Sequence, residues 1–390
     1  MKFTLRSILI FGITANLGLL GYFKYADFFI SSVNSLSGAS FSLLHLALPL
    51  AISFFTFQQI AYLVDSYRRE TSEYDFLNYC LFVSFFPQLI AGPIVHHKEM
   101  MPQFAQLKNS LVNHKNLAAG LMLFALGLFK KVVIADQFAV WATVGFDQAT
   151  TLNFLEAWAA SLSFSLQVYY DFSGYTDMAT GSALMFNIRL PLNFNSPYKG
   201  LSIQEFWQRW HMTLSRWLRD YLYIALGGNR KGPSRTYVNL FMTFLLGGLW
   251  HGAGWTFILW GAMHGFGTAV HKYWQTLGIR LSKPVSWIIT LFFVHCTMIV
   301  FRALSFDDMF KVFKGMFGFS GLVLPEKFQG LLTSLGMGGM MFGEAYEAIG
   351  GNSHTTIMLV LGTLIALFAK NSMEMLERFQ PNKKQMAFVV

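Results

Sequence analysis

Charged residues are few in this sequence. Asp, Glu, Lys and Arg make up 13% of its 390 residues, whereas about 25% is typical of a soluble domain. Hydrophobic residues make up 54% and aromatic residues 17%. This composition is typical of membrane proteins, in which Phe contacts lipid and Trp and Tyr lie at the membrane interface.

Cysteine is also scarce, and its scarcity excludes two kinds of stabilised fold. The two cysteines, Cys80 and Cys296, lie in apolar stretches, so neither a disulfide framework nor a Cys-based zinc site is expected. His264 and His271 are seven residues apart with no acidic or cysteine partner, which is a poor spacing for metal ligands. No Gly-x-Ser-x-Gly string is present, which argues against a serine nucleophile. We therefore expect no metal and no bound cofactor.

Long apolar runs predict the fold. A membrane-spanning helix needs about 20 mostly apolar residues. Eight runs approach this length: 7–23, 41–63, 117–135, 154–170, 236–250, 254–272, 286–303 and 355–370. The run 77–95 contains Pro87 and has basic loops on both sides, so it is interpreted as a re-entrant segment. The sequence thus predicts one all-α integral membrane domain over residues 1–390, with about eight transmembrane helices.

The placement of Lys and Arg predicts the topology. The formal net charge is +9, but the basic residues lie in a few loops, so the charge indicates orientation and not nucleic-acid binding. Segments 31–40 and 136–153 lack Lys and Arg, whereas 171–235 is rich in them. We expect the first two segments outside and the third in the cytoplasm, with both chain ends inside. Lys130 and Lys131 do not fit this rule and are expected to line a polar cavity.

A predicted cytoplasmic segment, 203–225, has aromatic residues at helical spacing. Phe206, Trp210, Trp217 and Tyr221 form one apolar face, which predicts an amphipathic helix in the membrane interface. Its arginines and the following Gly-Gly-Asn-Arg turn are candidates for binding the phosphates of an anionic acyl donor. The residues concerned are Arg209, Arg216, Arg219, Asn229 and Arg230. A plain membrane anchor is the alternative.

His251 is the most informative single residue. It lies in an apolar run of membrane length, between the predicted helices of a hairpin, with glycines on both sides. Polar residues at such depth are functional candidates. A neutral imidazole there is able to accept a hydroxyl proton while the hydroxyl attacks a thioester. From the residues alone, a structural histidine that bridges two helices is equally possible.

Further polar residues follow the run 154–170. Asp171, Ser173, Tyr175 and Asp177 lie where this helix is expected to reach the cytoplasm. They either line the cytoplasmic entrance or cap the end of the helix.

Four strings resemble the motifs of the membrane-bound O-acyltransferase family, and most nearly its alginate O-acetyltransferase branch. They are DFSGYTDMA, LPLNFNSPY, FWQRWHMTLSRWLRDYLYIALGGNR and LLGGLWHGAGWTFILWGAMHG. The similarity runs in order from about residue 16 to residue 303. Members of this branch have further hydrophobic segments before the string NLGLLGYFKY, which begins here at Asn16, so the resemblance implies a short N-terminus.

The resemblance implies a function and a set of site residues. An acetyl group from a cytoplasmic donor, acetyl-CoA or a related acyl donor, would cross the inner membrane of a bacterium to an extracytoplasmic polysaccharide. His251 matches the essential histidine of the family, and His211 matches its second histidine. Trp210, Arg219, Asp220 and Tyr221 lie within the same motif as His211. The acceptor would be alginate or another glycan.

Two other functions remain open on the sequence. In an ion-coupled or proton-coupled transporter, His251, Lys130, Lys131 and Asp177 would mark a path through the bundle. In a scaffold, the chain would export an acyl group to a separate periplasmic acetyltransferase partner.

Overall fold

The computed structural model describes residues 4–71, 75–89, 92–335 and 341–380, and these residues are mostly helical. Two short strands, β1 (Val323–Pro325) and β2 (Met341–Gly343), pair in parallel. The all-α expectation is therefore confirmed.

The first half of the chain contains helices from α1 to α9. In order these are α1 (Leu5–Leu20), η1 (Gly21–Tyr25), α2 (Ala26–Ser37), α3 (Ile52–Tyr67), α4 (Phe76–Ser84), α5 (Phe86–Leu89), α6 (His97–Phe104), η2 (Leu107–Ser110), α7 (His114–Leu128), η3 (Phe129–Ala135), α8 (Asp136–Thr143), η4 (Val144–Gln148) and α9 (Phe154–Met185).

The second half contains the helices that carry the two histidines. In order these are η5 (Pro197–Lys199), α10 (Ile203–Arg209), α11 (Met212–Trp217), η6 (Leu218–Tyr223), α12 (Pro233–His251), α13 (Trp255–Thr276), α14 (Lys283–Arg302), α15 (Phe306–Met316), η7 (Glu326–Phe328), α16 (Gln329–Ser334), η8 (Glu347–Ile349), α17 (Ser353–Phe368) and α18 (Ser372–Arg378).

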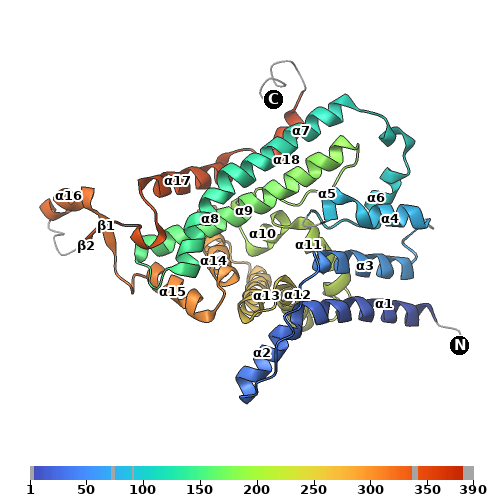
Figure 1. Ribbon diagram of the computed structural model, residues 1–390, viewed down its shortest axis with the longest axis horizontal. Helices are drawn as coiled ribbons and strands as arrows, with labels where there is room; N and C mark the ends of the chain where they lie inside the picture. The colour runs from blue at the N-terminus through green and yellow to red at the C-terminus, as the bar shows by residue number, and fades with distance from the viewer. Residues whose placement is uncertain (1–3, 72–74, 90–91, 336–340, 381–390) are drawn as a thin grey trace.

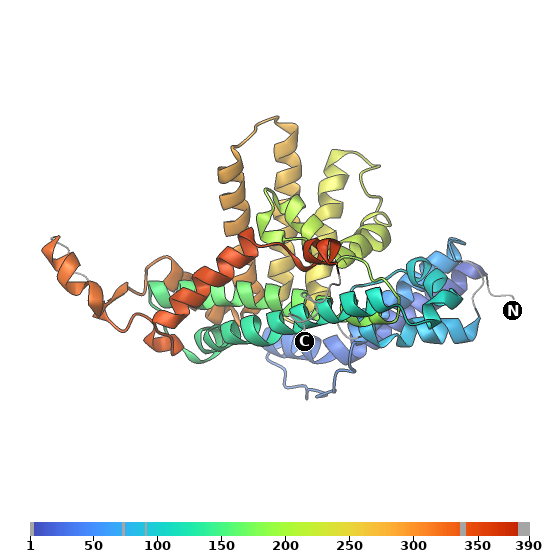
Figure 2. The same ribbon diagram turned by 90° about the horizontal axis from the view of Figure 1, so that it is seen from above.

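Two sets of helices cross each other. Helices α7 and α9 run side by side (Figure 1), and the group α12, α13 and α14 stands across them (Figure 2). Glycines allow α7 and α9 to approach closely, because a Cβ at Gly120 would lie 2.6 Å from the carbonyl oxygen of Gly181. Small residues at a helix interface are typical of membrane bundles.

The predicted hairpin with His251 at its tip is present. Helix α12 ends at His251 and α13 begins at Trp255. Gly252 and Gly254 between them are extended, with φ of −157° and −167°. The two helices touch at Gly248 and Gly261, where a Cβ on Gly248 would lie 2.8 Å from the Gly261 Cα.

Three stretches of the described residues are long and apolar enough to cross a membrane: Leu5–Ser37, His114–Gln148 and Lys283–Arg302. Ser353–Phe368 is a shorter apolar helix. The expected number of eight crossings remains a prediction.

Several predicted boundaries differ from the structure. The first run continues as a helix to Ser37, so most of the expected outer loop 31–40 is helical. The expected loop 136–153 is helical as far as Gln148. Both loops were predicted because they lack Lys and Arg, but charge reports orientation and not backbone conformation. The run 41–63 is helical only from Ile52. The run 77–95 forms two short helices, and its residues 90–91 lie outside the described part.

Candidate active site

The segment 203–225 is not the single interfacial helix that its periodicity predicts. It breaks between α10 and α11, where His211 has a φ of 42° and a ψ of 52°. Phe206 and Trp210 are 2% and 6% exposed, so this face is buried in the bundle and does not lie on its surface. The break turns the chain inward and directs His211 into the interior.

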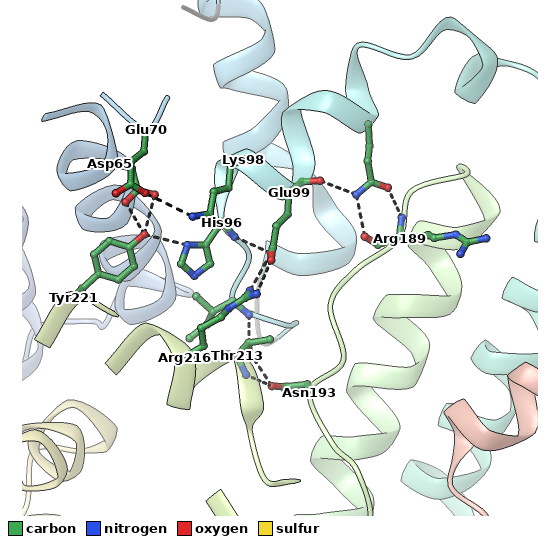
Figure 3. Close-up of polar contacts among 12 residues, drawn as sticks. Asp65, Glu70, His96, Lys98, Glu99, Arg189, Asn193, Thr213, Arg216 and Tyr221 are labelled. Carbon is green, nitrogen blue, oxygen red and sulfur yellow. Dashed lines mark hydrogen bonds and ion pairs between the residues drawn. The ribbon is translucent and has the colours of Figure 1, made fainter. Parts of the chain in front are cut away.

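Asn193 holds His211 in this left-handed conformation. The Asn193 carbonyl accepts from the Met212 amide at 2.9 Å. Its side-chain Oδ1 accepts from the Thr213 amide at 3.2 Å and the Thr213 hydroxyl at 2.8 Å, as Figure 3 shows. The His211 Nδ1 lies 3.0 Å from the same oxygen. Because an amide oxygen only accepts hydrogen bonds, Nδ1 carries the proton and Nε2 is unprotonated.

His251 is the last residue of α12, and side chains from the N-terminal helices hold this helix end. The Lys24 ammonium donates to the carbonyls of Trp250 and His251. The Tyr25 hydroxyl donates to the Leu249 carbonyl at 2.6 Å. The imidazole of His251 is enclosed by aromatic rings, with centroids 5.0 Å from Trp260 and 5.4 Å from Phe301.

Both histidines line one cavity of about 230 Å³. Its walls are mainly aromatic and apolar, and Lys24 and Ser53 are its other polar residues. The lining residues are Lys24, Ser53, Phe54, Val168, Phe172, Trp210, His211, Trp250, His251, Trp260, Met298 and Phe301. A buried apolar cavity with a few convergent polar groups is typical of a catalytic site.

A larger and more open groove of about 680 Å³ lies next to His211. Met212 and Thr213, the two residues after His211, line it. The groove also contains three cationic side chains, Arg216, Arg219 and Lys272. His211 therefore lies between an apolar cavity and a cationic groove.

The predicted donor-binding residues divide into two groups. Arg216, Arg219 and Asn229 line the groove, and Trp210 lines the cavity. The remaining five, Arg209, Asp177, Asp220, Tyr221 and Arg230, do not line either. Asp220 pairs with Arg219 at 2.7 Å. Arg209 is held by Glu205 at 2.9 Å and by the Asn195 carbonyl.

Tyr221 belongs to a polar cluster that also contains Asp65 and His96 (Figure 3). Its hydroxyl donates to Asp65 at 2.8 Å and lies 3.0 Å from the His96 Nδ1. Burial would raise the pKa of Asp65, but hydrogen bonds from His97 and Tyr221 outweigh it, so that pKa lies below its usual value. Burial, and then the Arg216 guanidinium, lower the pKa of His96. The cluster ties α3 to η6, and Leu218, Arg219 and Tyr223 of η6 line the groove.

Arg216 is anchored in the same region. It forms a paired contact with Glu99, with Nη2 2.9 Å from Oε2. A bidentate pair of this kind fixes the orientation of the guanidinium plane. The guanidinium therefore has a fixed position in the groove wall, and Glu99 balances its charge.

Asp177 and the two lysines of η3 lie in ion pairs. Lys130 is 2.7 Å from Asp177 and donates to the Ser372 hydroxyl at 2.6 Å. Lys131 pairs with Asp136 at 2.6 Å and with Asp171 at 2.8 Å. Carboxylates neutralise both lysines, which explains why they lie at a position where the distribution of Lys and Arg predicts no positive charge. They do not line the histidine cavity.

The remaining histidines of α13 do not form a metal site. His264 is fully buried and accepts from the Trp207 Nε1 at 3.1 Å, and His271 lies 3.1 Å from Gln275. Among the described residues, no group of three or more His, Cys, Asp or Glu side chains is placed to hold a metal ion.

The profile of the membrane-bound O-acyltransferase family matches residues 13–304. The chain belongs to this family. The resemblance seen in its motifs is thereby confirmed, and both histidines lie inside the matched region.

Named relatives in the family act on different polymers. The chain is 52% identical to a peptidoglycan O-acetyltransferase of Helicobacter pylori, over 82% of this chain and 66% of the relative. It is 43% identical to a probable alginate O-acetylase of Pseudomonas aeruginosa, over 85% and 64%. It is 26% identical to a teichoic acid D-alanyltransferase of Streptococcus thermophilus, over 61% and 59%. The chain thus spans about two thirds of the length of the first two relatives.

Sequence reasoning missed several residues of this family site. Asn193 lies in the string LPLNFNSPY, and Lys24 lies in NLGLLGYFKY. Both strings had been noted, but as motifs without assigned roles. Lys272 is the last residue of the apolar run 254–272, where a lysine usually marks only the end of a membrane helix. The signal for Lys24 is its position in the interior of a largely apolar stretch of 33 residues, in which Arg6 and Asp27 are the other charged residues.

Proposed function

We propose that this protein is a membrane O-acetyltransferase that takes an acetyl group from a cytoplasmic thioester donor for transfer to a polysaccharide hydroxyl. The observation that carries the proposal is the single cavity that both His211 and His251 line. Membership of the O-acyltransferase family supports the same activity. The catalytic roles of the two histidines are part of the proposal.

The chemistry requires one proton transfer at each end of the reaction. The His251 imidazole accepts the proton of the acceptor hydroxyl while that oxygen attacks the thioester carbonyl carbon. The carbon–sulfur bond then breaks, and the proton passes to the leaving thiolate, so the products are an acetyl ester and a free thiol. His211, with Nδ1 fixed by Asn193, positions the thioester at the groove side of the cavity.

The cationic groove supports acetyl-CoA as the donor. Arg216, Arg219 and Lys272 line it, and guanidinium and ammonium groups bind phosphates well. The two arginines are paired with Glu99 and Asp220 in the structure, so a donor phosphate would exchange with these carboxylates. An anionic donor seated there would direct its thioester toward His211, because Met212 and Thr213 belong to the groove wall. The groove would then face the cytoplasm of a bacterial inner membrane.

The proposed acceptor is an extracytoplasmic glycan. Two relatives act, by their names, on peptidoglycan and on alginate, so a sugar hydroxyl is the shared acceptor chemistry. In one version of the proposal, this chain only exports the acetyl group. A separate periplasmic transferase then transfers it to the glycan. The glycan that loses its ester groups when the gene is deleted identifies the acceptor.

The test uses the full chain in lipid nanodiscs, with acetyl-CoA and a glycan fragment. Release of free thiol and ester formation are measured for the wild type and for His251→Ala. Loss of a general base costs about 10²- to 10⁴-fold in rate. His114→Ala is the matched control, because His114 is exposed at the start of α7. A folded His251→Ala protein that retained wild-type turnover would contradict the assignment.

A transport function predicts a different result. Ion flux into liposomes would then depend on His251 without any acyl donor. The pairing of Lys130 with Asp177 and of Lys131 with Asp136 does not favour this function, because these groups neutralise one another.

A further inference from the structure

We propose that Lys24 and Tyr25 form a clamp that positions His251 by binding the carbonyl end of α12. This inference deepens the proposed function, because it assigns positioning residues for the same reaction. Neither residue is a direct partner of the substrate.

The need for such a clamp follows from where His251 lies. The last four carbonyl groups of any α-helix lack partners within the helix. Many helices satisfy them by turning back at a left-handed glycine. Helix α12 instead leaves His251 through an extended Gly252, with a φ of −157° and a ψ of 153°. The chain therefore runs away from the helix end.

Lys24 and Tyr25 supply the missing donors from a distant part of the sequence. Three consecutive carbonyls are satisfied: Tyr25 donates to Leu249 at 2.6 Å, and Lys24 donates to Trp250 and His251, the latter at 3.3 Å. These contacts join residues more than 220 positions apart. The negative end of a helix dipole also favours a nearby cation.

The donor count of Lys24 defines its role. An ammonium group has three N–H donors. Lys24 uses one for each of the two carbonyls and one for the Ser53 hydroxyl at 3.1 Å. No donor is left for a developing oxyanion, although Lys24 lines the cavity. Lys24 is therefore a positioning residue.

Aromatic rings pack closely around the end of α12, so a small shift of this helix end would move His251. Trp250 stacks on Phe57 with centroids 4.6 Å apart, and the Lys24 ammonium lies 5.7 Å from the Trp250 ring. A shift of the last turn would move the His251 ring against Trp260 and Phe301. A displacement of about 1 Å is enough to reduce a rate by about 100-fold.

The experiment compares Lys24→Ala, Lys24→Arg and Tyr25→Phe in the full chain. For Lys24→Ala we expect kcat to fall about 10- to 100-fold, with the KM for acetyl-CoA within about threefold of wild type. Lys24→Arg retains N–H donors and should restore part of the activity. Lys115→Ala is the matched control, because Lys115 is exposed on α7.

Added amines distinguish positioning from simple charge. Ethylammonium, which has N–H donors, should raise kcat of Lys24→Ala, whereas tetramethylammonium, which has none, should not. Equal rescue by both cations would overturn the clamp, because charge alone would then suffice. Wild-type kcat in a Lys24→Ala protein would overturn it as well.

A second measurement does not depend on activity. Amide hydrogen exchange in the last turn of α12 should be faster in Lys24→Ala than in the wild type or in Lys115→Ala, because the helix end frays without its donors. Unchanged exchange would overturn the clamp. If the wild type released no thiol, the proposed function would fail, but the exchange result would still decide on the clamp.

Discussion

Asn193 provides the sharpest test of how the site is built. It is fully buried, and its Oδ1 is the common acceptor for the His211 imidazole, the Thr213 amide and the Thr213 hydroxyl. The substitution Asn193→Ala removes that oxygen but keeps the backbone carbonyl that accepts from Met212. The variant thus removes the acceptor of three donors, together with the Nδ2 group that donates to the Thr176 hydroxyl at 3.5 Å.

The magnitude follows from the donors left without a partner. A buried donor without an acceptor costs about 1–3 kcal/mol. The Thr213 hydroxyl can rotate to another acceptor and the His211 imidazole can change tautomer, but the Thr213 amide can do neither. We therefore expect the free energy of unfolding to fall by about 1–3 kcal/mol. The left-handed conformation of His211, which itself costs about 1–2 kcal/mol, would relax.

The rate should fall more than the affinity for the donor. Without Asn193 the His211 ring is free to rotate and to change tautomer, and loss of such a partner typically costs about 10- to 100-fold in activity. The assay is thiol release from acetyl-CoA together with thermal unfolding. Asn195→Ala is the matched control, since the Asn195 side chain accepts one bond from Asn371 and does not touch His211. Equal losses in both variants, or full activity in Asn193→Ala, would refute the reasoning.

Three other predictions concern packing, the polar cluster and the groove. Gly248→Ala should destabilise the hairpin by about 1–3 kcal/mol, because the new Cβ would overlap the Phe257 carbonyl. Gly247→Ala should be tolerated, because its Cβ would only contact Leu218 at 3.4 Å. Thermal unfolding of both variants checks this prediction. Asp65→Asn should lower stability at neutral pH, because the lowered pKa of Asp65 means that its carboxylate stabilises the folded state above about pH 4. That difference from wild type should disappear in acid, as pH falls through the folded-state pKa, and a difference that persisted there would contradict it. Lys272→Gln should raise the KM for acetyl-CoA about two- to fivefold, and the effect should shrink at high salt; an unchanged KM at low salt would exclude Lys272 from donor binding.

The two histidines differ in how far the sequence alone could identify them. His251 stands out because a titratable side chain in a membrane-length apolar run is unusual. His211 lies among arginines and tryptophans, where polar residues are expected, and only the family motif singled it out. Its buried position depends on Asn193, which is 18 residues earlier in the chain. Periodicity within 203–225 carries no information about that contact.

The fold shows the same division between local and long-range information. Apolar runs located the helices well, and the glycines of the α12–α13 connection correctly predicted a hairpin. The helical course of 26–37 and of 136–148 was missed, because absence of Lys and Arg was interpreted as a loop. Nothing in those stretches breaks a helix strongly, since neither contains proline.

Both histidines lie at helix ends, and this placement explains why distant residues belong to the site. His211 precedes the first residue of α11, and His251 is the last residue of α12. A helix end leaves backbone groups without partners in the helix, so the amides after His211 need acceptors and the carbonyls at His251 need donors. Asn193 supplies the first and the Lys24–Tyr25 pair the second. Because each histidine lies at a helix end, the helix alone does not fix its backbone, and residues of another motif hold it in place. A substitution in either supporting motif should therefore act on catalysis through one histidine without touching the other.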